Sequence, residues 1–453
     1  MSRCSSIVAA LTLLALAACG VGGDTTVASN NDLRPTQPDL SDQLFQPNEI
    51  VQVDINMDPD DYDILRSEGR YFATIATGCA NEFEYSHFNA TVTINGEVLN
   101  DVDIRKKGFL GSLSAGRPSI KLDFDELRPD RRFYGTRRMT LNNNLQDPSN
   151  THTCMAYELF RKAGVAAPRC NFARVSVNGK DLGIYSHIDS IKKLFLRRNF
   201  GNDTGNLYEA QIADFGENLK ENFQLKTNKE INDRSDLSAV VSALNATDEN
   251  LASLLSQVVD LDAFVTFWAA EAVIGHWDGS TSNANNYWIY NNPDNGLIYY
   301  IPWGTDGALE QDSLLSPGTG PLYHATNIPS RLYKIPEFKQ KYDARVLELL
   351  EQLWNAESLN AEVDRIRDLT ATPEVNMTQV RRFIREYDGK VRAAVAGETQ
   401  QTERTIPDFV QVCDKSGYMT LTGNIVDGRG TVEWVDLNGD LITVPVSASP
   451  PSA

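Results

Sequence analysis

Residues 261–290, LDAFVTFWAAEAVIGHWDGSTSNANNYWIY, decide how this chain folds. The apolar run up to Ile274 is long enough for a buried helix, and Gly275 is a residue at which helices commonly end. The strand-like run at 287–290, the turn NPDNG at 292–296 and the apolar run at 298–301 predict a β-hairpin. The sequence therefore predicts a helix, a polar loop and a hairpin in direct succession.

Polar residues stand at both ends of this hairpin. Asp278 and Asn286 precede it, and Asp306 follows it in the run IPWGTD. Because hairpin closure brings the two ends together, we expect these side chains to share a site. Two carboxylates beside a third oxygen ligand suit Mg²⁺ or Mn²⁺ holding phosphates. A helix-capping Asp278 and a turn-forming Asp306 are the structural alternative, which the spacing leaves open.

On either side of this segment the chain changes character. The sequence before it is rich in strand-like runs, and the sequence after it is mostly helical. We therefore expect an α+β fold with a β-rich first lobe over 47–150 and a helix-rich second lobe that ends near residue 397. Strand-like runs return after residue 405 and predict a small β module over 405–453. The predicted elements are strands at 50–55, 90–94, 102–105, 119–124, 138–141, 173–177, 182–188, 418–426, 431–436 and 441–446, and helices at 151–163, 190–199, 237–245, 251–259, 337–354, 359–369 and 378–396.

Composition narrows the classes of function. The chain has 453 residues, 61 acidic and 42 basic, with a formal net charge of −19. The acid excess disfavours nucleic acid as a partner, because phosphates reward Lys and Arg. The sequence carries no G-x-S-x-G elbow, no Walker A motif, no dinucleotide-binding glycine pattern and no H-E-x-x-H. Serine-hydrolase, P-loop and zinc-hydrolase chemistry are therefore disfavoured.

The beginning of the chain resembles an export signal. Residues 1–18 combine a weakly positive start with an apolar stretch, which predicts a signal peptide. The run LAAC at 16–19 resembles a bacterial lipobox, so we expect cleavage before Cys19 and acylation of its thiol. An ordinary signal peptide cut near Ala18 is the alternative. We expect an exported protein held at the bacterial membrane or cell envelope by lipid on Cys19, with residues 19–46 as a flexible linker.

Export affects how the cysteines are interpreted. Four of them, Cys79, Cys154, Cys170 and Cys413, remain after the signal and the lipidated cysteine are set aside. An even number in an oxidising compartment predicts disulfides, and the sequence does not choose among the three pairings. Zinc binding is the alternative, but there is no C-x-x-C and no nearby pair of histidines.

Several segments, in the same order, resemble the spore-coat-protein-H (CotH) kinases, a remote branch of the protein-kinase-like fold. The resemblance covers about residues 49–350. The segments that carry it are IRKKG at 104–108 with RPSIK at 117–121, LNNNLQDPS at 141–149, LFRKAGVAAPR at 159–169, VNGKDLGIY at 177–185, GNLY at 205–208, WD at 277–278 with NY at 286–287, and PWGTD at 302–306.

The resemblance implies a two-lobed, kinase-like domain over 47–400 and transfer of the γ-phosphoryl group of ATP to Ser or Thr of a secreted or envelope protein. Asp278 would orient or deprotonate the acceptor hydroxyl. Lys121 and Arg105 would neutralise nucleotide phosphates, and Asp189, where the family usually has Glu, would pair with Lys121. Asn286 and Asp306 would hold Mg²⁺ or Mn²⁺. The structural alternatives are that Lys121 and Arg105 are solvated strand residues and that Asp189 only caps the helix that begins at Ser190.

One departure from the family pattern bears on activity. The first Asp of the family's P-W-D-x-D motif is Gly304 here, which removes one carboxylate from the expected metal site. A catalytically weak pseudokinase that acts as a surface binding or scaffold lipoprotein is therefore the second hypothesis. A different metal-dependent transferase that uses the same two aspartates, for nucleotidyl or glycosyl transfer, is the third.

Overall fold

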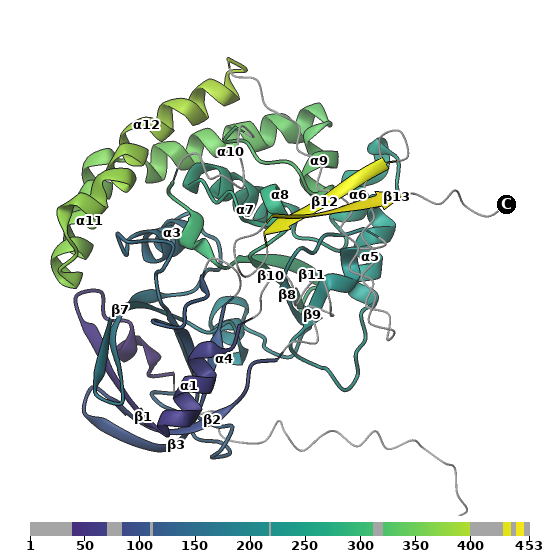
Figure 1. Cartoon of the computed structure of the whole chain (residues 1–453). Helices are drawn as coiled ribbons and strands as arrows, with labels where there is room; N and C mark the ends of the chain where they lie inside the picture. Colours follow the sequence, from purple (N-terminus) through teal and green to yellow (C-terminus); the bar gives the residue numbers. More distant parts are fainter. Residues whose placement is uncertain are drawn as a thin grey trace, which may run out of the picture. The chain divides into compact units, whose positions relative to one another are not determined.

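The structure, a computed structural model, mixes helices and strands, as the sequence predicts for an α+β protein (Figure 1). The structure describes residues 39–69, 84–108, 112–216, 219–310 and 320–398, and the backbone of 429–435 and 441–447. Outside these ranges lie the expected signal peptide, Cys19, Cys79, Cys413 and the predicted strand at 418–426. No helix within the described ranges is long and apolar enough to cross a membrane.

Seven strands of the first half close into a barrel in the order β1-β2-β3-β4-β5-β7-β6. All neighbours are antiparallel except β1 and β6, which pair in parallel, for example Val53 with Val175. The predicted strands are confirmed, but the predicted boundary at residue 150 is wrong, because β6 and β7 lie beyond it and complete the barrel. The strands are β1 (Ile50–Met57), β2 (Phe88–Ile94), β3 (Glu97–Lys107), β4 (Ser119–Asp123), β5 (Arg138–Asn142), β6 (Cys170–Val177) and β7 (Lys180–Ile188).

Alternation along the strands fills the barrel with apolar side chains. Ile104 and Leu122, which are paired across β3 and β4, have no exposed surface. Residues of opposite parity on these strands, Arg105 and Lys121 among them, therefore project away from the barrel core. This alternation decides where the cations of the candidate site lie.

One helix of this half was not predicted from the sequence. Helix α1 (Pro59–Ser67) buries only Leu65, so no apolar period marks it. It begins where the Asp58 carboxylate accepts the backbone N–H of Asp60 at 2.8 Å. Its end is held by the buried Lys106, whose ammonium donates to the Arg66 carbonyl at 2.8 Å.

The second half contains a four-stranded sheet and most of the helices. The sheet order is β11-β10-β8-β9, in which β10 (Tyr287–Asn292) and β11 (Leu297–Pro302) are the predicted hairpin. Strands β8 (Leu207–Ala210) and β9 (Phe223–Leu225) are too short to be recognised from their sequence. The helices are α3 (His152–Lys162), α4 (Lys193–Phe200), α5 (Ser235–Leu244), α6 (Asp248–Leu255), α7 (Leu261–Ile274), α8 (Ser280–Asn283), α9 (Asn327–Tyr333), α10 (Pro336–Leu353), α11 (Ala356–Thr370) and α12 (Thr378–Val395).

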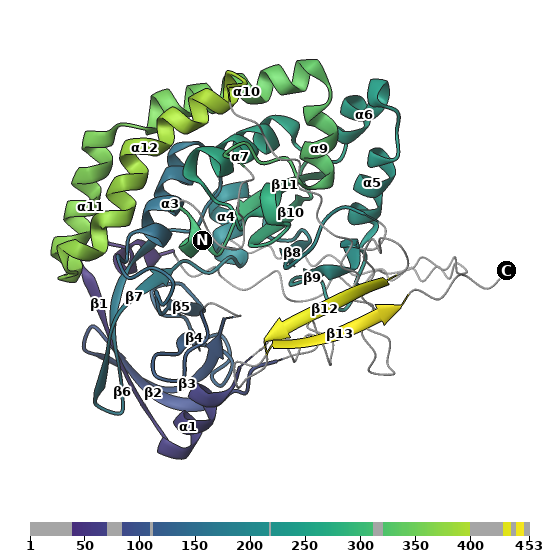
Figure 2. The ribbon, with the colours of Figure 1, turned by 45° about the horizontal axis from the view of Figure 1, so that its top comes forward.

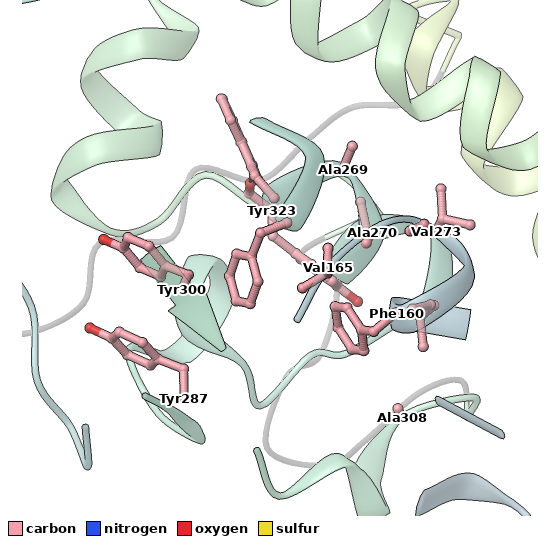
Figure 3. Close-up of a cluster of buried hydrophobic side chains, with 14 of the residues drawn as sticks. Phe160, Val165, Ala269, Ala270, Val273, Tyr287, Tyr300, Ala308 and Tyr323 are labelled. Carbon is pink, nitrogen blue, oxygen red and sulfur yellow. Dashed lines mark hydrogen bonds between the residues drawn. The ribbon is translucent and has the colours of Figure 1, made fainter. Parts of the chain in front are cut away.

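Helix α7 is buried on all sides over 267–274, as its apolar sequence predicts, and lies between α10 and the sheet (Figure 2). On its α10 side, Trp268 stacks on Tyr342 with ring centroids 3.9 Å apart. On its sheet side it meets Tyr287 and Tyr300, whose rings stack at 5.5 Å (Figure 3). The helix therefore fixes both the position of the hairpin and the loop that begins at its own C-terminus.

The N-terminal end of the described chain is packed on the domain rather than forming a linker. Residues Ser41–Leu44 form a 3₁₀ turn, and Leu44 is 1% exposed. The Asn171 amide donates to the Leu44 carbonyl at 2.8 Å, and Phe45 stacks on His187 at 4.3 Å. The predicted linker over 19–46 is therefore too long at its C-terminal end, because polar residues of this segment pair with the domain.

A disulfide joins Cys154 of α3 to Cys170 of β6, with their Cα atoms 5.0 Å apart. This confirms the predicted bridge for two of the four cysteines. Near the C-terminus, β12 (Arg429–Val435) and β13 (Leu441–Ser447) pair as an antiparallel hairpin, which confirms the last two predicted strands.

Candidate functional site

The loop after α7 is held by a buried glutamate of that helix. Glu271 has no exposed surface, and its two carboxylate oxygens accept the backbone N–H groups of Ser280 and Thr281, each at 2.8 Å. These are the first residues of α8, whose N-cap residue, Gly279, has no side chain to cap the helix. Glu271 therefore caps it instead. A Cβ on Gly279 would lie 2.2 Å from a Glu271 oxygen, so the close approach requires glycine.

Asp278 lies in this loop and accepts hydrogen bonds from three asparagine amides. Asn286 donates at 2.6 Å, Asn285 donates at 3.3 Å, and Asn283 is a third donor. Burial raises the pKa of Asp278 above its usual value, the amides of Asn283 and Asn285 oppose the rise, and the charge of Asp306 adds to it. The result is a carboxylate of fixed orientation and increased basicity.

Asn286 lies against Gly304 at the open end of the hairpin. The backbone N–H of Trp303 donates to the Asn286 carbonyl at 3.0 Å, which holds the two residues together. Gly304 has a φ of +51°, and a Cβ there would lie 2.3 Å from the Asn286 side-chain oxygen. The glycine therefore makes room for the Asn286 amide, and no other residue fits this position without moving Asn286.

Asp306 follows in the 3₁₀ turn Thr305–Gly307. Its backbone carbonyl lies 3.1 Å from the Nδ1 atom of His152, whereas its carboxylate makes no hydrogen bond or ion pair to any residue that the structure describes. The charge of this carboxylate reaches Asp278 and the ammonium of Lys107. The hairpin thus brings Asp278, Asn286 and Asp306 to one place.

These residues fit a divalent cation with oxygen ligands. Since Asn286 turns its amide nitrogen toward Asp278, its Oδ1 atom remains an acceptor, and the Asp306 carboxylate is uncommitted. A hard cation such as Mg²⁺ takes one or two carboxylates and completes its shell with water and phosphate. Within the described parts of the chain, no group of three or more His, Cys, Asp or Glu forms a ready-made metal cage. The donor set therefore suits a cation that is shared with a phosphate ligand.

One basic residue of the barrel, Lys107 of β3, feels the charge of this acidic group, and two further cations lie on the same outer side of β3 and β4. Arg105 and Lys121 are cross-strand partners on the outer side of the barrel, and Lys107 has the same parity as Arg105. Burial and then the adjacent Arg105 lower the pKa of Lys121 well below its usual value. Burial also lowers the pKa of Lys107, while Asp306 and Glu209 oppose that change.

Asp189 does not form the expected ion pair with Lys121. Its carboxylate accepts from Arg169 at 3.0 Å and also pairs with Arg198. The reason is local, because the Asp189 N–H also bonds the Arg169 carbonyl at 2.9 Å and so fixes the residue beside that arginine. The structure places Asp189 in the network that holds the 3₁₀ turn at Ser41–Leu44.

The acidic neighbour of Lys121 is instead Glu209 of β8. Although burial acts to raise the pKa of Glu209, the charges of Lys226 and Lys121 lower it below its usual value. Lys226 lies 2.6 Å from the Glu209 carboxylate. Sequence reasoning missed Glu209, although it directly follows the GNLY segment at 205–208. Neither β8 nor the pairing that aims this side chain at β4 could be read from the sequence.

Comparisons of the sequence with known proteins agree with the resemblance. A family model described as "CotH kinase protein" matches residues 104–411. The "Inner spore coat protein H" of Bacillus subtilis (strain 168) is 23% identical over 274 residues, which are 56% of this chain and 75% of that protein. "Invasin CotH7" of Rhizopus delemar is 22% identical over 240 residues, 48% of this chain and 40% of the invasin. Among solved structures, the Helicobacter pylori proinflammatory kinase CtkA aligns with a TM-score of 0.33 and 11% identity over 62% of this chain and 93% of CtkA.

Proposed function

The chain belongs to the CotH kinase protein family, and from this premise we propose that it transfers the γ-phosphoryl group of ATP to a Ser or Thr hydroxyl of another protein. The observation that carries the proposal is the arrangement around Asp278. An oriented carboxylate and a second, uncommitted carboxylate meet at one end of the β10–β11 hairpin, and the charge of the second reaches Lys107 of the barrel. Phosphoryl transfer needs this combination of positioning and charge neutralisation far more than covalent chemistry.

Asp278 is the residue that receives the acceptor hydroxyl. Its three amide donors hold the carboxylate in one orientation, and its raised pKa makes it a better proton acceptor than an exposed aspartate. Glu271 acts through the loop, because it fixes the start of α8 and so the position of Asn283, one of those donors. Glu271 is thus a positioning residue.

Asp306 and the Asn286 Oδ1 atom would hold the divalent cation, which neutralises phosphate charge when it is bound. Lys121, Arg105 and Lys107 supply fixed positive charge on the other side, from strands whose buried faces make them rigid. Because Lys121 is surrounded by other cations, an anionic ligand would raise its lowered pKa and secure its charged form. These residues therefore bind and orient the phosphates of the nucleotide.

A binding or scaffold protein without catalytic activity is the second candidate. Gly304 is the observation that favours it, since this position offers no carboxylate and its conformation excludes a side chain. The site then holds one carboxylate fewer than the family pattern provides. Asp278, however, is present and is held by three asparagine amides, which favours an enzyme over a scaffold protein.

The proposal extends to the cell envelope. The lipobox at 16–19 supports export and lipid attachment at Cys19. The disulfide between Cys154 and Cys170 supports an oxidising compartment. The acceptor would then be a secreted or envelope protein.

Incubation of the protein with ATP and Mn²⁺ together with a mixture of envelope proteins tests the function, with intact mass as the readout. The proposal expects a mass gain of one phosphate on an acceptor or on the protein itself. A gain of AMP would instead show nucleotidyl transfer. No gain, although calorimetry detects ATP binding, would support the scaffold and contradict the kinase.

A further inference from the structure

A second group of basic residues lies on the face of the β11-β10-β8-β9 sheet that is turned away from α7. Trp288 of β10 and Glu209 of β8 are cross-strand partners, so they share this face. Lys226, just beyond β9, reaches the same place and pairs with Glu209 at 2.6 Å. The apolar residues of this face pack on α4, and the charge of Glu209 at its polar end reaches Lys121 of β4 and Lys107 of β3.

The ring of Trp288 lies within reach of two ammonium groups. The Nζ atom of Lys192 is 5.7 Å from the ring centroid, and that of Lys226 is 5.9 Å from it. Lys192 is the N-cap residue of α4, and no side chain in the described part of the chain caps that helix end. Burial, followed by the charges of Arg138 and Lys226, lowers the pKa of Lys192 to about 7. The positive charge of Lys192 and Lys226 together therefore exceeds the negative charge that Glu209 supplies here.

Trp288 adds a donor that has no acceptor. The residue is 4% exposed, and its indole N–H is buried without a hydrogen-bond partner among the residues that the structure describes. A buried N–H that is left unpaired is costly, and native structures rarely leave one without a reason. An oxyanion placed between the two lysines would accept from the indole and balance the excess positive charge.

We propose that Lys192, Lys226 and the indole N–H of Trp288 form a binding subsite for a phosphate group, in which Glu209 is the resident counter-ion that the ligand replaces. The subsite is continuous with Lys121, whose pKa responds to both Lys192 and Glu209. The identity of the natural ligand rests on the proposed function, since the phosphate chain of a nucleotide would then occupy the subsite. The anion site itself rests on the geometry alone, and a free polyphosphate has the same chemistry.

Calorimetric titration of the whole protein with inorganic tripolyphosphate in EDTA, at about pH 6.5 so that Lys192 is charged, tests the subsite without a metal or a base. Lys192→Gln and Lys226→Gln should each weaken binding by about 10- to 100-fold, the worth of one charge-assisted hydrogen bond. Trp288→Phe keeps an aromatic ring but removes the indole N–H, and it should weaken binding several-fold. Lys180→Gln, which removes one exposed ammonium of β7, is the matched control and should leave the dissociation constant unchanged.

Glu209→Gln separates a binding subsite from a structural charge network. Removal of the competing carboxylate should tighten tripolyphosphate binding, whereas a structural ion pair with Lys226 would only lower stability. Parallel titration with ATP distinguishes the sources, because a nucleotide site gains affinity from the adenosine and a free-polyphosphate site does not. Tripolyphosphate binding that is equal in the parent, Lys226→Gln and Trp288→Phe, or that Glu209→Gln leaves unchanged, would overturn the inference.

The proposed function fails separately. If the variants lose tripolyphosphate binding while the parent transfers no phosphate to any acceptor, the subsite stands and the kinase does not. If phosphate transfer proceeds while Lys192→Gln and Lys226→Gln bind tripolyphosphate like the parent, the kinase stands and the subsite does not.

Discussion

Replacement of Gly304 by Asp restores the family's P-W-D-x-D motif in sequence, yet we expect it to damage the site. The new Cβ would lie 2.3 Å from the Asn286 Oδ1 atom, so the Asn286 side chain must move. That movement breaks the 2.6 Å hydrogen bond from Asn286 to Asp278, which as a bond to a charged group is worth ~1.5–3 kcal/mol. The positive φ of residue 304 adds about 1 kcal/mol for a residue with a side chain.

The free energy of unfolding of Gly304→Asp should therefore fall by roughly 2.5–4 kcal/mol in urea titrations. The value of kcat/KM should fall by about 10- to 150-fold, because Asp278 loses the donor that orients it. Gly296→Asp is the matched control, since Gly296 also has a positive φ, of +72°, but its Cβ would meet no atom of the described residues within 4 Å. It should cost only the backbone term of about 1 kcal/mol and leave kcat/KM unchanged.

A double variant isolates the steric part of the effect. With Asn286→Ala already in place, Gly304→Asp should cost only about 1 kcal/mol more, because no amide remains to be displaced. Higher activity or tighter Mn²⁺ binding in Gly304→Asp, with unchanged stability, would refute the reasoning. The site would then be one that lacks a ligand rather than one built around glycine.

Three further predictions follow from the structure. Burial raises the pKa of Asp214 to about 6, so the folded state takes up the proton before the unfolded state does. As the pH falls from about 8 to about 5, the parent should therefore gain about 1.4 kcal/mol of unfolding free energy relative to Asp214→Asn. A stability difference between the two proteins that does not change with pH would contradict this. Removal of the Cys154–Cys170 bridge by a double Ser substitution should lower the unfolding free energy by about 3 kcal/mol, and an unchanged urea midpoint would show that the bridge contributes nothing. Asp189→Asn should lower stability but keep the dissociation constant for ATP, whereas Lys121→Met should weaken ATP binding about tenfold or more; the opposite order would return Asp189 to the nucleotide site.

Local sequence signals predicted the elements on which the site depends. Helix α7 and the hairpin after it were predictable because a continuous apolar run and a turn with Asn and Gly are local features. The same features predicted that Asp278, Asn286 and Asp306 would meet. Closure of the barrel was not predictable, since the parallel pairing of β1 with β6 joins residues that are far apart in sequence.

Charge pairing across elements was also beyond the sequence. Asp189 follows a predicted strand and Glu209 follows the GNLY segment, and nothing in their neighbours shows which one faces Lys121. Which of the two carboxylates faces Lys121 depends on the register of β8 against β10 and on the hydrogen bond from Arg169 to Asp189. The role of Gly304 was likewise hidden, because only the structure shows the Asn286 amide in the space that a side chain would fill.

The most direct test of the central claim is a paired measurement on Asp278→Asn and Asp306→Asn, with ATP binding by calorimetry in Mn²⁺ beside the rate of phosphate transfer. Asp278→Asn should bind ATP like the parent and lose about 10²–10⁴-fold in rate, because only the acceptor hydroxyl depends on this carboxylate. Asp306→Asn should lose Mn²⁺-dependent ATP binding together with the rate. If both variants bind ATP and transfer phosphate like the parent, neither carboxylate belongs to a phosphoryl-transfer site and the account is wrong.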